Sequence, residues 1–193
     1  MFRWLPFLTY AFAALATPGP NTILSFSTAS RVGFRRSLPF CAGVWVGFFC
    51  VMLLCTAFCS LLQSYLPMLH LPMLIVGALY LIYLAWHTYK STDAVSAAGE
   101  AGSFRKGLVL QFANIKVYLC CLMALEGYIL PAYEGQALPL AGFVALMPSL
   151  SFLVLLLWAG FGAALSRFLN RHRKAANTVF ALLLVYCAIA LFL

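Results

Sequence analysis

Two places in this chain put polar groups and helix-breaking residues inside stretches that are otherwise strongly apolar. The first is the run TPGPN at residues 17–21, whose prolines remove backbone donors and turn the residue before each away from helical geometry. The second is the stretch 111–116, which holds two amides and a lysine. Carbonyl groups freed inside an apolar helix need a protein partner or a wet cavity, so both places predict a binding site for a polar solute. The candidate residues are Thr17, Pro18, Gly19, Pro20, Asn21, Gln111, Asn114 and Lys116.

Each of these features also has a purely structural interpretation. A proline kink can serve helix packing alone, although packing needs one proline and not Pro-Gly-Pro followed by a polar residue. A lysine at the centre of a membrane costs roughly 2.5–3.5 kcal/mol, yet Lys116 could extend its side chain to an aqueous interface. Glu126 is a candidate for proton coupling, because a carboxylate in a low dielectric tends to take up a proton. Its place near the end of an apolar stretch suits an interfacial position equally well.

The composition indicates that the elements holding these residues lie in a membrane. Of the 193 residues, 65% are hydrophobic and only 8% are charged, and the mean hydropathy is +1.00. A soluble domain carries roughly 25% charged residues, so this chain could not cover such a domain with polar groups. The composition therefore excludes a soluble enzyme, a disordered protein and a disulfide-rich secreted domain. We expect an all-α integral membrane protein that forms a single membrane domain over residues 1–193.

Six apolar stretches are long enough to cross a bilayer, which takes about 20 residues in a helix. They span residues 4–26, 38–62, 66–88, 107–130, 137–165 and 174–193. The connection 89–106 is the only one that has the composition of an aqueous loop, and it divides the chain into halves 1–88 and 107–193. Because each half has an odd number of spans, the two halves would lie in opposite orientations if they are duplicates. The pattern predicts two inverted three-helix repeats with a binding site between them, and a first helix broken at Pro-Gly-Pro.

The distribution of Lys and Arg predicts the orientation of the spans. The connection 89–106 and the two others on its side hold ten basic residues, whereas Arg3 alone lies on the opposite side. Positive residues mark the cytoplasmic side, so both termini are expected on the periplasmic side. Residues 4–16 also have features of a cleavable signal peptide, but the segment continues into the TPGPN run, so we interpret it as a retained span. The net charge of +8 sits in short clusters between apolar runs, which does not indicate nucleic-acid binding.

The spacing of the cysteines and of two glycines adds expectations about metal binding and helix packing. All seven cysteines lie in apolar runs without C-x-x-C or zinc-site spacing, so they are interpreted as buried thiols, and no metal site is expected. Gly43 and Gly47 form a G-x-x-x-G pattern, which favours close helix packing within the bundle or in a homodimer.

The same motifs resemble a known family. The run 17–21, followed by Gly33-Phe34-Arg35 and then Gly43 and Gly47, resembles the first half of the LysE/RhtB family of amino-acid exporters. The stretch FANIK at 112–116 is similar to the second-half motif, in which much of the family has Asn-Pro-Lys. Ile115 replaces that proline, so a milder helix break is expected here.

The resemblance covers essentially the whole chain, and it is greatest to family members that export cysteine and O-acetylserine from bacterial inner membranes. The stretches that carry this likeness are 51–55, 80–86, 110–116 and 181–187. It implies an inner-membrane exporter of small neutral amino acids that works by alternating access, driven by a proton gradient and without a cofactor. Main-chain amides at the broken helix, with Asn21 and Lys116, would bind the substrate carboxylate. Freed carbonyls, with Asn114 or Gln111, would bind its ammonium group.

Other functions remain open at this stage. Relatives export homoserine, threonine, leucine or basic amino acids, although a chain with so few intramembrane charges suits a dibasic substrate poorly. A membrane thiol–disulfide carrier also uses six spans with helix-breaking prolines, but no cysteine adjoins the TPGPN run in sequence. A metal exporter would need clusters of carboxylates, histidines or cysteines, and an enzyme would need a nucleophile with its base. A structural subunit would not need a broken helix.

Overall fold

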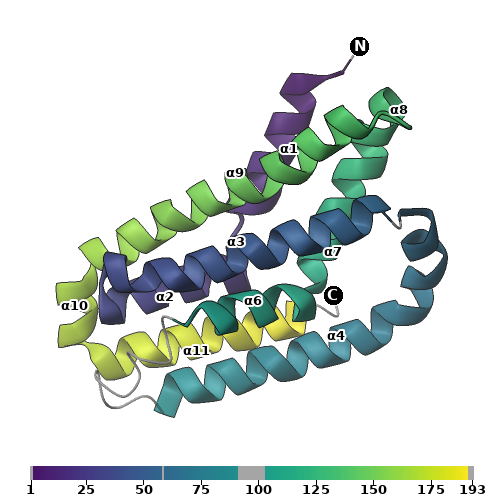
Figure 1. Ribbon diagram of the computed structural model, residues 1–193. Coiled ribbons are helices and arrows are strands. Elements are labelled where there is room, and N and C mark those ends of the chain that lie inside the picture. Colours follow the sequence, from purple (N-terminus) through teal and green to yellow (C-terminus); the bar gives the residue numbers. More distant parts are fainter. Residues whose placement is uncertain (1, 58, 91–102, 191–193) are drawn as a thin grey trace.

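The computed structural model describes residues 2–57, 59–90 and 103–190, and the described residues form helices joined by short connections (Figure 1). In chain order the elements are α1 (Trp4–Ala16), α2 (Pro20–Val32), α3 (Phe34–Ala57), α4 (Cys59–Lys90), α6 (Phe104–Ala113), α7 (Ile115–Ala124), the π-helical segment η1 (Leu125–Ile129), α8 (Leu130–Tyr133), α9 (Ala137–Ala164), α10 (Ser166–Arg171) and α11 (Arg173–Ala190). Most of the expected linker, residues 91–102, and the end of the last expected span, residues 191–193, lie outside the described residues.

The number of long apolar helices agrees only in part with the six expected spans. Within the described residues, three helical stretches are long and apolar enough to cross a membrane: Phe34–Ala57, Ile115–Tyr133 and Ala137–Ala164. Two shorter apolar helices are Trp4–Ala16 and Lys174–Ile189. The prediction that the first span breaks at Pro-Gly-Pro is confirmed, because α1 ends at Ala16 and α2 begins at Pro20.

Two expected boundaries are wrong. The first broken span does not end at residue 26, since α2 continues to Val32, where Gly33 (φ 84°) adopts a conformation that favours glycine. The expected connection between residues 62 and 66 is part of α4, which begins at Cys59. A few polar residues are not enough to end a helix, because polar side chains have helix propensities close to those of apolar ones.

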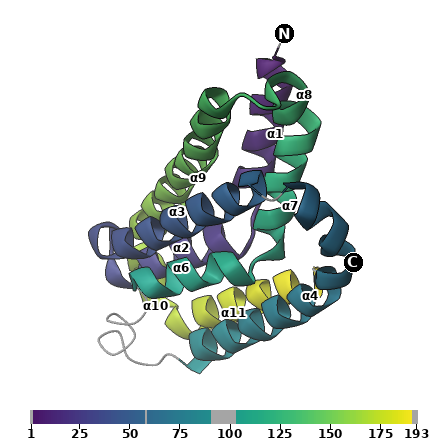
Figure 2. The same cartoon turned by 45° about the vertical axis from the view of Figure 1, so that its right-hand side comes forward.

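The basic clusters of the sequence gather at one end of the molecule. Here α2 ends and α3 begins, α4 and α9 end, and α6, α10 and α11 begin, on the left of Figure 1. We call this the linker end. The opposite end holds α8, the start of α9 and the N-terminus. Figures 1 and 2 both show α4 and α11 side by side, and Figure 2 shows α1 beside α7.

Glycines bring the helices of the two halves into backbone contact near the linker end. A Cβ atom on Gly43 of α3 would lie 2.0 Å from the carbonyl oxygen of Phe104 in α6, and one on Gly107 would lie 2.2 Å from that of Phe40. A Cβ on Gly47 would lie 2.7 Å from Cγ of Gln111. The expected close packing at the G-x-x-x-G pattern is confirmed, and the helix that it contacts belongs to the same chain.

The buried side chains form two apolar clusters. One joins α1, α3, α7, η1 and α9 around Phe7, Met52 and Leu125. The other joins α2, α3, α4, α6, α9 and α11 around Val44, Leu110 and Leu184. Many large apolar side chains point outward instead, for example Leu138, which is 86% exposed. An apolar exterior of this kind suits contact with lipid.

Candidate functional site

The first helix break is built by its prolines, a glycine and two threonines. At the end of α1, both the N–H and the hydroxyl of Thr17 donate to the carbonyl of Ala13. Pro20 then starts α2, the helical position at which the missing N–H costs nothing. Between them, Gly19 is extended (φ −162°), its N–H donates to Oγ1 of Thr22 at 2.9 Å, and the Thr22 hydroxyl donates to the Gly19 carbonyl at 3.0 Å. The chain therefore leaves helical geometry for a short, well-bonded stretch.

The second break has no proline. Helix α6 ends at Ala113 and α7 begins at Ile115, so Asn114 alone leaves helical geometry (φ −99°, ψ 92°). The Asn114 carbonyl accepts the N–H of Val117 at 2.9 Å and thus starts α7. The break at Asn114 is accordingly shorter than the first one. Replacement of the proline by Ile115 has not made the helix continuous.

Three amide side chains connect the two breaks. Asn21 Nδ2 donates to Gln111 Oε1 at 3.0 Å, and Gln111 Nε2 donates to Asn21 Oδ1 at 3.0 Å. Asn114 Nδ2 donates to the same Asn21 oxygen at 3.3 Å. Gln111 is fully buried and Asn114 is 6% exposed, so these bonds replace water that neither group can reach easily. Residues about ninety positions apart in sequence thus form one polar network.

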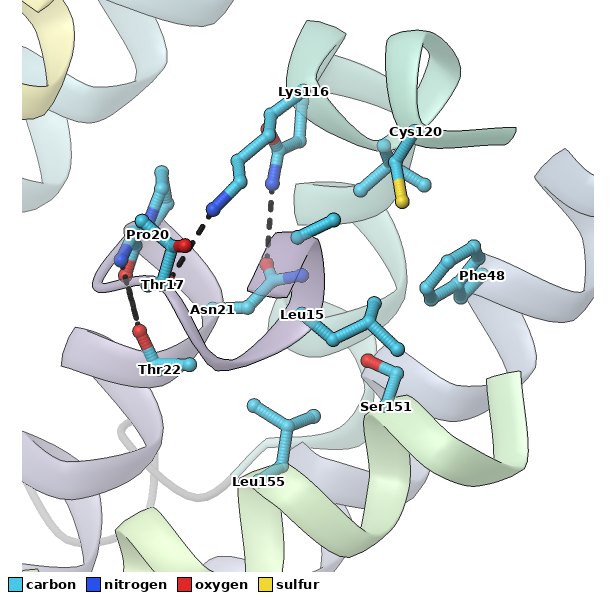
Figure 3. Close-up of a pocket in the computed structure, with 14 residues that line it drawn as sticks. Leu15, Thr17, Pro20, Asn21, Thr22, Phe48, Lys116, Cys120, Ser151 and Leu155 are labelled. Atoms are coloured by element: carbon cyan, nitrogen blue, oxygen red, sulfur yellow. Dashed lines mark hydrogen bonds between the residues drawn. The ribbon is translucent and has the colours of Figure 1, made fainter. Parts of the chain in front are cut away.

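Lys116 reaches from the second break to the first. Its Nζ donates to the carbonyl oxygen of Thr17 at 3.3 Å and lies against Gly19, where a Cβ atom would be 3.2 Å from Nζ (Figure 3). The carbonyl is one that the proline break has released from helical bonding. In this structure the ammonium group therefore points to the meeting of the two breaks and not along the helix to its end.

A small cavity opens where the two breaks meet (Figure 3). It is lined by Ala14, Leu15, Thr17, Gly19, Pro20, Asn21, Thr22, Phe48, Asn114, Lys116, Val117, Cys120, Ser151 and Leu155. Pro18 and Gln111 are the predicted residues outside this lining, and Gln111 stands directly behind Asn21 through the amide pair. The structure therefore brings the predicted residues together around one cavity. Their role in binding stays a prediction.

The sequence did not indicate the apolar and hydroxyl side of the cavity. Phe48 of α3 and Leu155 of α9 supply apolar walls, and Ser151 of α9 is 6% exposed with its oxygen drawn on the cavity side in Figure 3. Cys120 follows Lys116 by one helical turn, a spacing that places two side chains on one helix face and could have identified it. Nothing in the local sequence of Phe48 or Leu155 separates them from other core residues.

Helix dipoles give the cavity two electrostatic sides. Ala14 and Leu15 belong to the last turn of α1, where carbonyls carry partial negative charge. Asn21 and Thr22 belong to the first turn of α2, and Lys116 and Val117 to the first turn of α7, where N–H groups carry partial positive charge. With the Lys116 ammonium, the cavity can bind an anionic group on one side and a cationic group on the other.

Glu126, the candidate for proton coupling, is not part of the cavity lining. It is exposed on η1, and its carboxylate accepts a weak hydrogen bond from the Cys59 thiol at 3.8 Å. π-Helical turns occur frequently at functional sites, but coupling through Glu126 stays a prediction.

Comparison with known proteins gives a family and named relatives. Residues 12–193 match the LysE type translocator family. The chain is 36% identical over 184 residues to the cysteine/O-acetylserine efflux protein of Klebsiella pneumoniae, covering 95% of this chain and 93% of the relative. It is also 36% identical over 188 residues to the proteins of the same name from Escherichia coli K12 and Shigella flexneri, covering 96% of this chain and 95% of each relative. No solved structure matches the chain significantly.

Proposed function

The chain belongs to the LysE type translocator family, which consists of transporters and not enzymes, and from that membership we propose that it exports small neutral amino acids through the cavity between its two helix breaks. The observation that carries this proposal is the hydrogen bonding of Asn21 to Gln111 and Asn114, which joins the two breaks into one site. A broken helix inside a membrane is costly, and it is retained where its backbone groups serve a solute.

An amino-acid zwitterion fits the two sides of the cavity. Its carboxylate would accept hydrogen bonds from Lys116 and from the first-turn N–H groups of α2, as anions do at helix N-termini. Its ammonium would donate to the carbonyl of Thr17, which now accepts Lys116, and to the last carbonyls of α1. Each charge would then have a partner, which a charged group in a low dielectric requires.

The remaining lining favours a short, neutral substrate side chain. Phe48, Leu155 and Cys120 provide apolar contact, and Ser151 offers one hydroxyl. Among the described residues of the lining, none is acidic, so a dibasic substrate would leave its second ammonium without a partner. The relatives named for cysteine and O-acetylserine efflux agree with this size and charge, and these two amino acids are the substrates that we propose. Homoserine, threonine or leucine are the alternatives.

The proposal includes the arrangement of the chain in the bacterial inner membrane. Six spans would form two inverted repeats, each opened by a broken helix, α1–α2 in one half and α6–α7 in the other. Proline inside the next long helix of each half, Pro39 in α3 and Pro148 in α9, supports the correspondence. The basic linker end would face the cytoplasm and both termini the periplasm. A proton gradient would drive alternating access to the cavity.

Efflux from proteoliposomes tests this proposal. Vesicles holding the purified protein would be loaded in turn with labelled cysteine, O-acetylserine, threonine, leucine and lysine, and efflux followed under an imposed proton gradient. We expect cysteine and O-acetylserine to leave the vesicles, and Asn21→Ala to be inactive. Efflux of threonine or leucine alone would retain the function and overturn the substrate, whereas no efflux of any amino acid would contradict the function itself.

A thiol–disulfide carrier is the second candidate because Cys120 lines the cavity beside the first break, although no cysteine is near that break in sequence. Amino-acid export needs only the volume of this side chain, so Cys120→Ser should retain efflux. The matched control is Cys50→Ser, on a cysteine outside the cavity. Loss of activity in Cys120→Ser but not in Cys50→Ser would favour redox chemistry.

A further inference from the structure

Two further cavities lie between the helix breaks and the linker end, and neighbouring cavities share wall residues. The middle cavity, the smallest of the three, is lined by Pro20, Gly77, Tyr80, Leu81, Leu110, Ala113 and Asn114. Pro20 and Asn114 also line the cavity at the breaks. Tyr80 also lines a third cavity, which reaches the linker end. The three cavities therefore form a series in which each shares wall residues with the next.

One face of each of three helices lines this series. On α2 the face is formed by Pro20, Leu24, Thr28 and Arg31, at intervals of three or four residues that repeat on one side of a helix. On α4 the corresponding residues are Gly77, Tyr80, Leu84, His87 and Thr88. On α6 they are Lys106, Leu110 and Ala113, and Asn114 follows at the end of the helix. A continuous stripe on each helix indicates one route and not three unrelated gaps.

The chemistry of the walls changes along the route. The middle cavity is mainly apolar, and Tyr80 lines both it and the third cavity. The third cavity is lined by three basic side chains, Arg31, His87 and Lys106. Three hydroxyl groups line it as well, on Ser27, Thr28 and Thr88, whose residues are 4%, 5% and 7% exposed. The positive charges of Arg31 and Lys106, together with buried hydroxyls, form a site suited to a carboxylate or another small anion.

We infer that this third cavity, here called the Arg31 cavity, is the entrance subsite of the transport route. It binds the carboxylate of the amino acid before the substrate passes Tyr80 and reaches the helix breaks. This inference rests on the proposed function, and it adds a second binding station and a gate to the site at the breaks. The positive charge at the entrance raises the local concentration of the carboxylate.

Arg31 also holds helices together, which decides how the subsite is tested. Its Nη2 donates to Asn177 Oδ1 of α11 at 3.0 Å and to the Thr88 carbonyl of α4 at 3.5 Å. A substitution there would disturb packing as well as charge. Lys106 and Tyr80 are better test positions, because each has a matched neighbour on the same helix outside the cavities. The neighbours Arg105 and Tyr89 are exposed.

The experiment compares transport with binding in the full-length protein. Labelled O-acetylserine uptake by counterflow would be measured in vesicles of neutral phosphatidylcholine, which contain no anionic headgroup to act as the ligand. Equilibrium binding of the same compound would be measured in detergent. We expect Lys106→Gln to raise the KM about tenfold, the size of effect of one charge-assisted hydrogen bond. Arg105→Gln should keep the wild-type KM.

Tyr80→Trp places a larger side chain at the gate and so narrows the passage, and it leaves the residues of the site at the breaks unchanged. We expect the transport rate to fall about tenfold or more while equilibrium binding stays unchanged, since only passage is obstructed. Tyr89→Trp is the control and should transport like the wild type. Lys106→Gln, at a partly exposed position, keeps the test decisive if Tyr80→Trp does not fold.

The outcomes separate this inference from the proposed function. If Lys106→Gln and Tyr80→Trp transport like their controls while the wild type is active and Asn21→Ala is not, the entrance subsite is overturned and the function stands. If the wild type moves no amino acid, the function itself fails, and the inference that rests on it fails too.

Discussion

The break between α1 and α2 contains two prolines and a glycine, whereas the break between α6 and α7 contains only Asn114 and no proline. In the first, the missing proline donors interrupt the helix by local chemistry alone. In the second, Asn114 is held out of helical geometry where its amide bonds to Asn21 of the other half. The first break is therefore set by local sequence, whereas the second depends on tertiary contact. The second break should be the more sensitive to loss of its partner, Asn21.

Proline substitution at two nearby positions in α7 tests this difference most strongly. Leu119→Pro removes a helical N–H donor in the interior of α7, and should cost about 3 kcal/mol of folding free energy or more. Ile115→Pro places proline at the first residue of α7, after a residue already outside helical geometry, and should change stability by less than about 1 kcal/mol. Denaturant unfolding in detergent measures both. Equal loss in the two variants would show that α7 does not start at Ile115.

Removal of either amide of the pair should disable both breaks together. Asn21→Ala removes both hydrogen bonds of the amide pair from the fully buried Gln111, and Gln111→Ala leaves Asn21 bonded to Asn114 alone, so each should lower the efflux rate about a hundredfold. Because the two act as a unit, the double variant should be no slower than the slower single variant. Efflux from proteoliposomes provides the measurement. Losses that multiply in the double variant would mean that the breaks act independently.

The contact between halves also predicts unequal effects at two glycines of α9. A Cβ atom at Gly162 would lie 2.2 Å from the Phe26 carbonyl of α2, whereas one at Gly160 would meet nothing within 4 Å. Gly162→Ala should therefore destabilise the protein by about 1–3 kcal/mol through overpacking, and Gly160→Ala should not. The thermal unfolding midpoint in detergent distinguishes the two. An unchanged midpoint in Gly162→Ala would indicate that α2 and α9 do not pack this closely.

The smallest of these effects concerns Lys116, whose ammonium group bridges the breaks through Thr17. Lys116→Gln keeps a donor but removes the charge that would attract the carboxylate, so the KM should rise about tenfold. Lys90→Gln serves as control, because Lys90 lies at the exposed end of α4 beside Trp86. The KM of efflux should change in the first variant only. A similar rise in the KM of both variants would mean that Lys116 acts only through the overall positive charge of the protein.

Sequence patterns predicted the polar centre of this protein better than the ends of its helices. The TPGPN run predicted the first break, because proline acts on its own backbone whatever surrounds it. The second break could be located from Gln111, Asn114 and Lys116 but not described, since it depends on a partner ninety residues away. Helix ends were misplaced at residues 26 and 62–66, where hydropathy changes but the backbone is not interrupted.

The apolar lining of the cavity could not be predicted for a different reason. Phe48, Ser151 and Leu155 belong to long helices in which many similar residues exist, and only the packing of α3 and α9 selects the few that face the breaks. Cys120 is the exception, since its helical spacing from Lys116 was visible. If the substrate binds here as proposed, this side of the cavity would contact its side chain.

Equilibrium binding of labelled O-acetylserine to the purified protein tests directly whether the substrate binds where the two breaks meet. The wild type and Lys90→Gln should bind with the same Kd, and Asn21→Ala should show no saturable binding. If Asn21→Ala instead binds with the wild-type Kd, the substrate site lies elsewhere and the account given for the two breaks is contradicted.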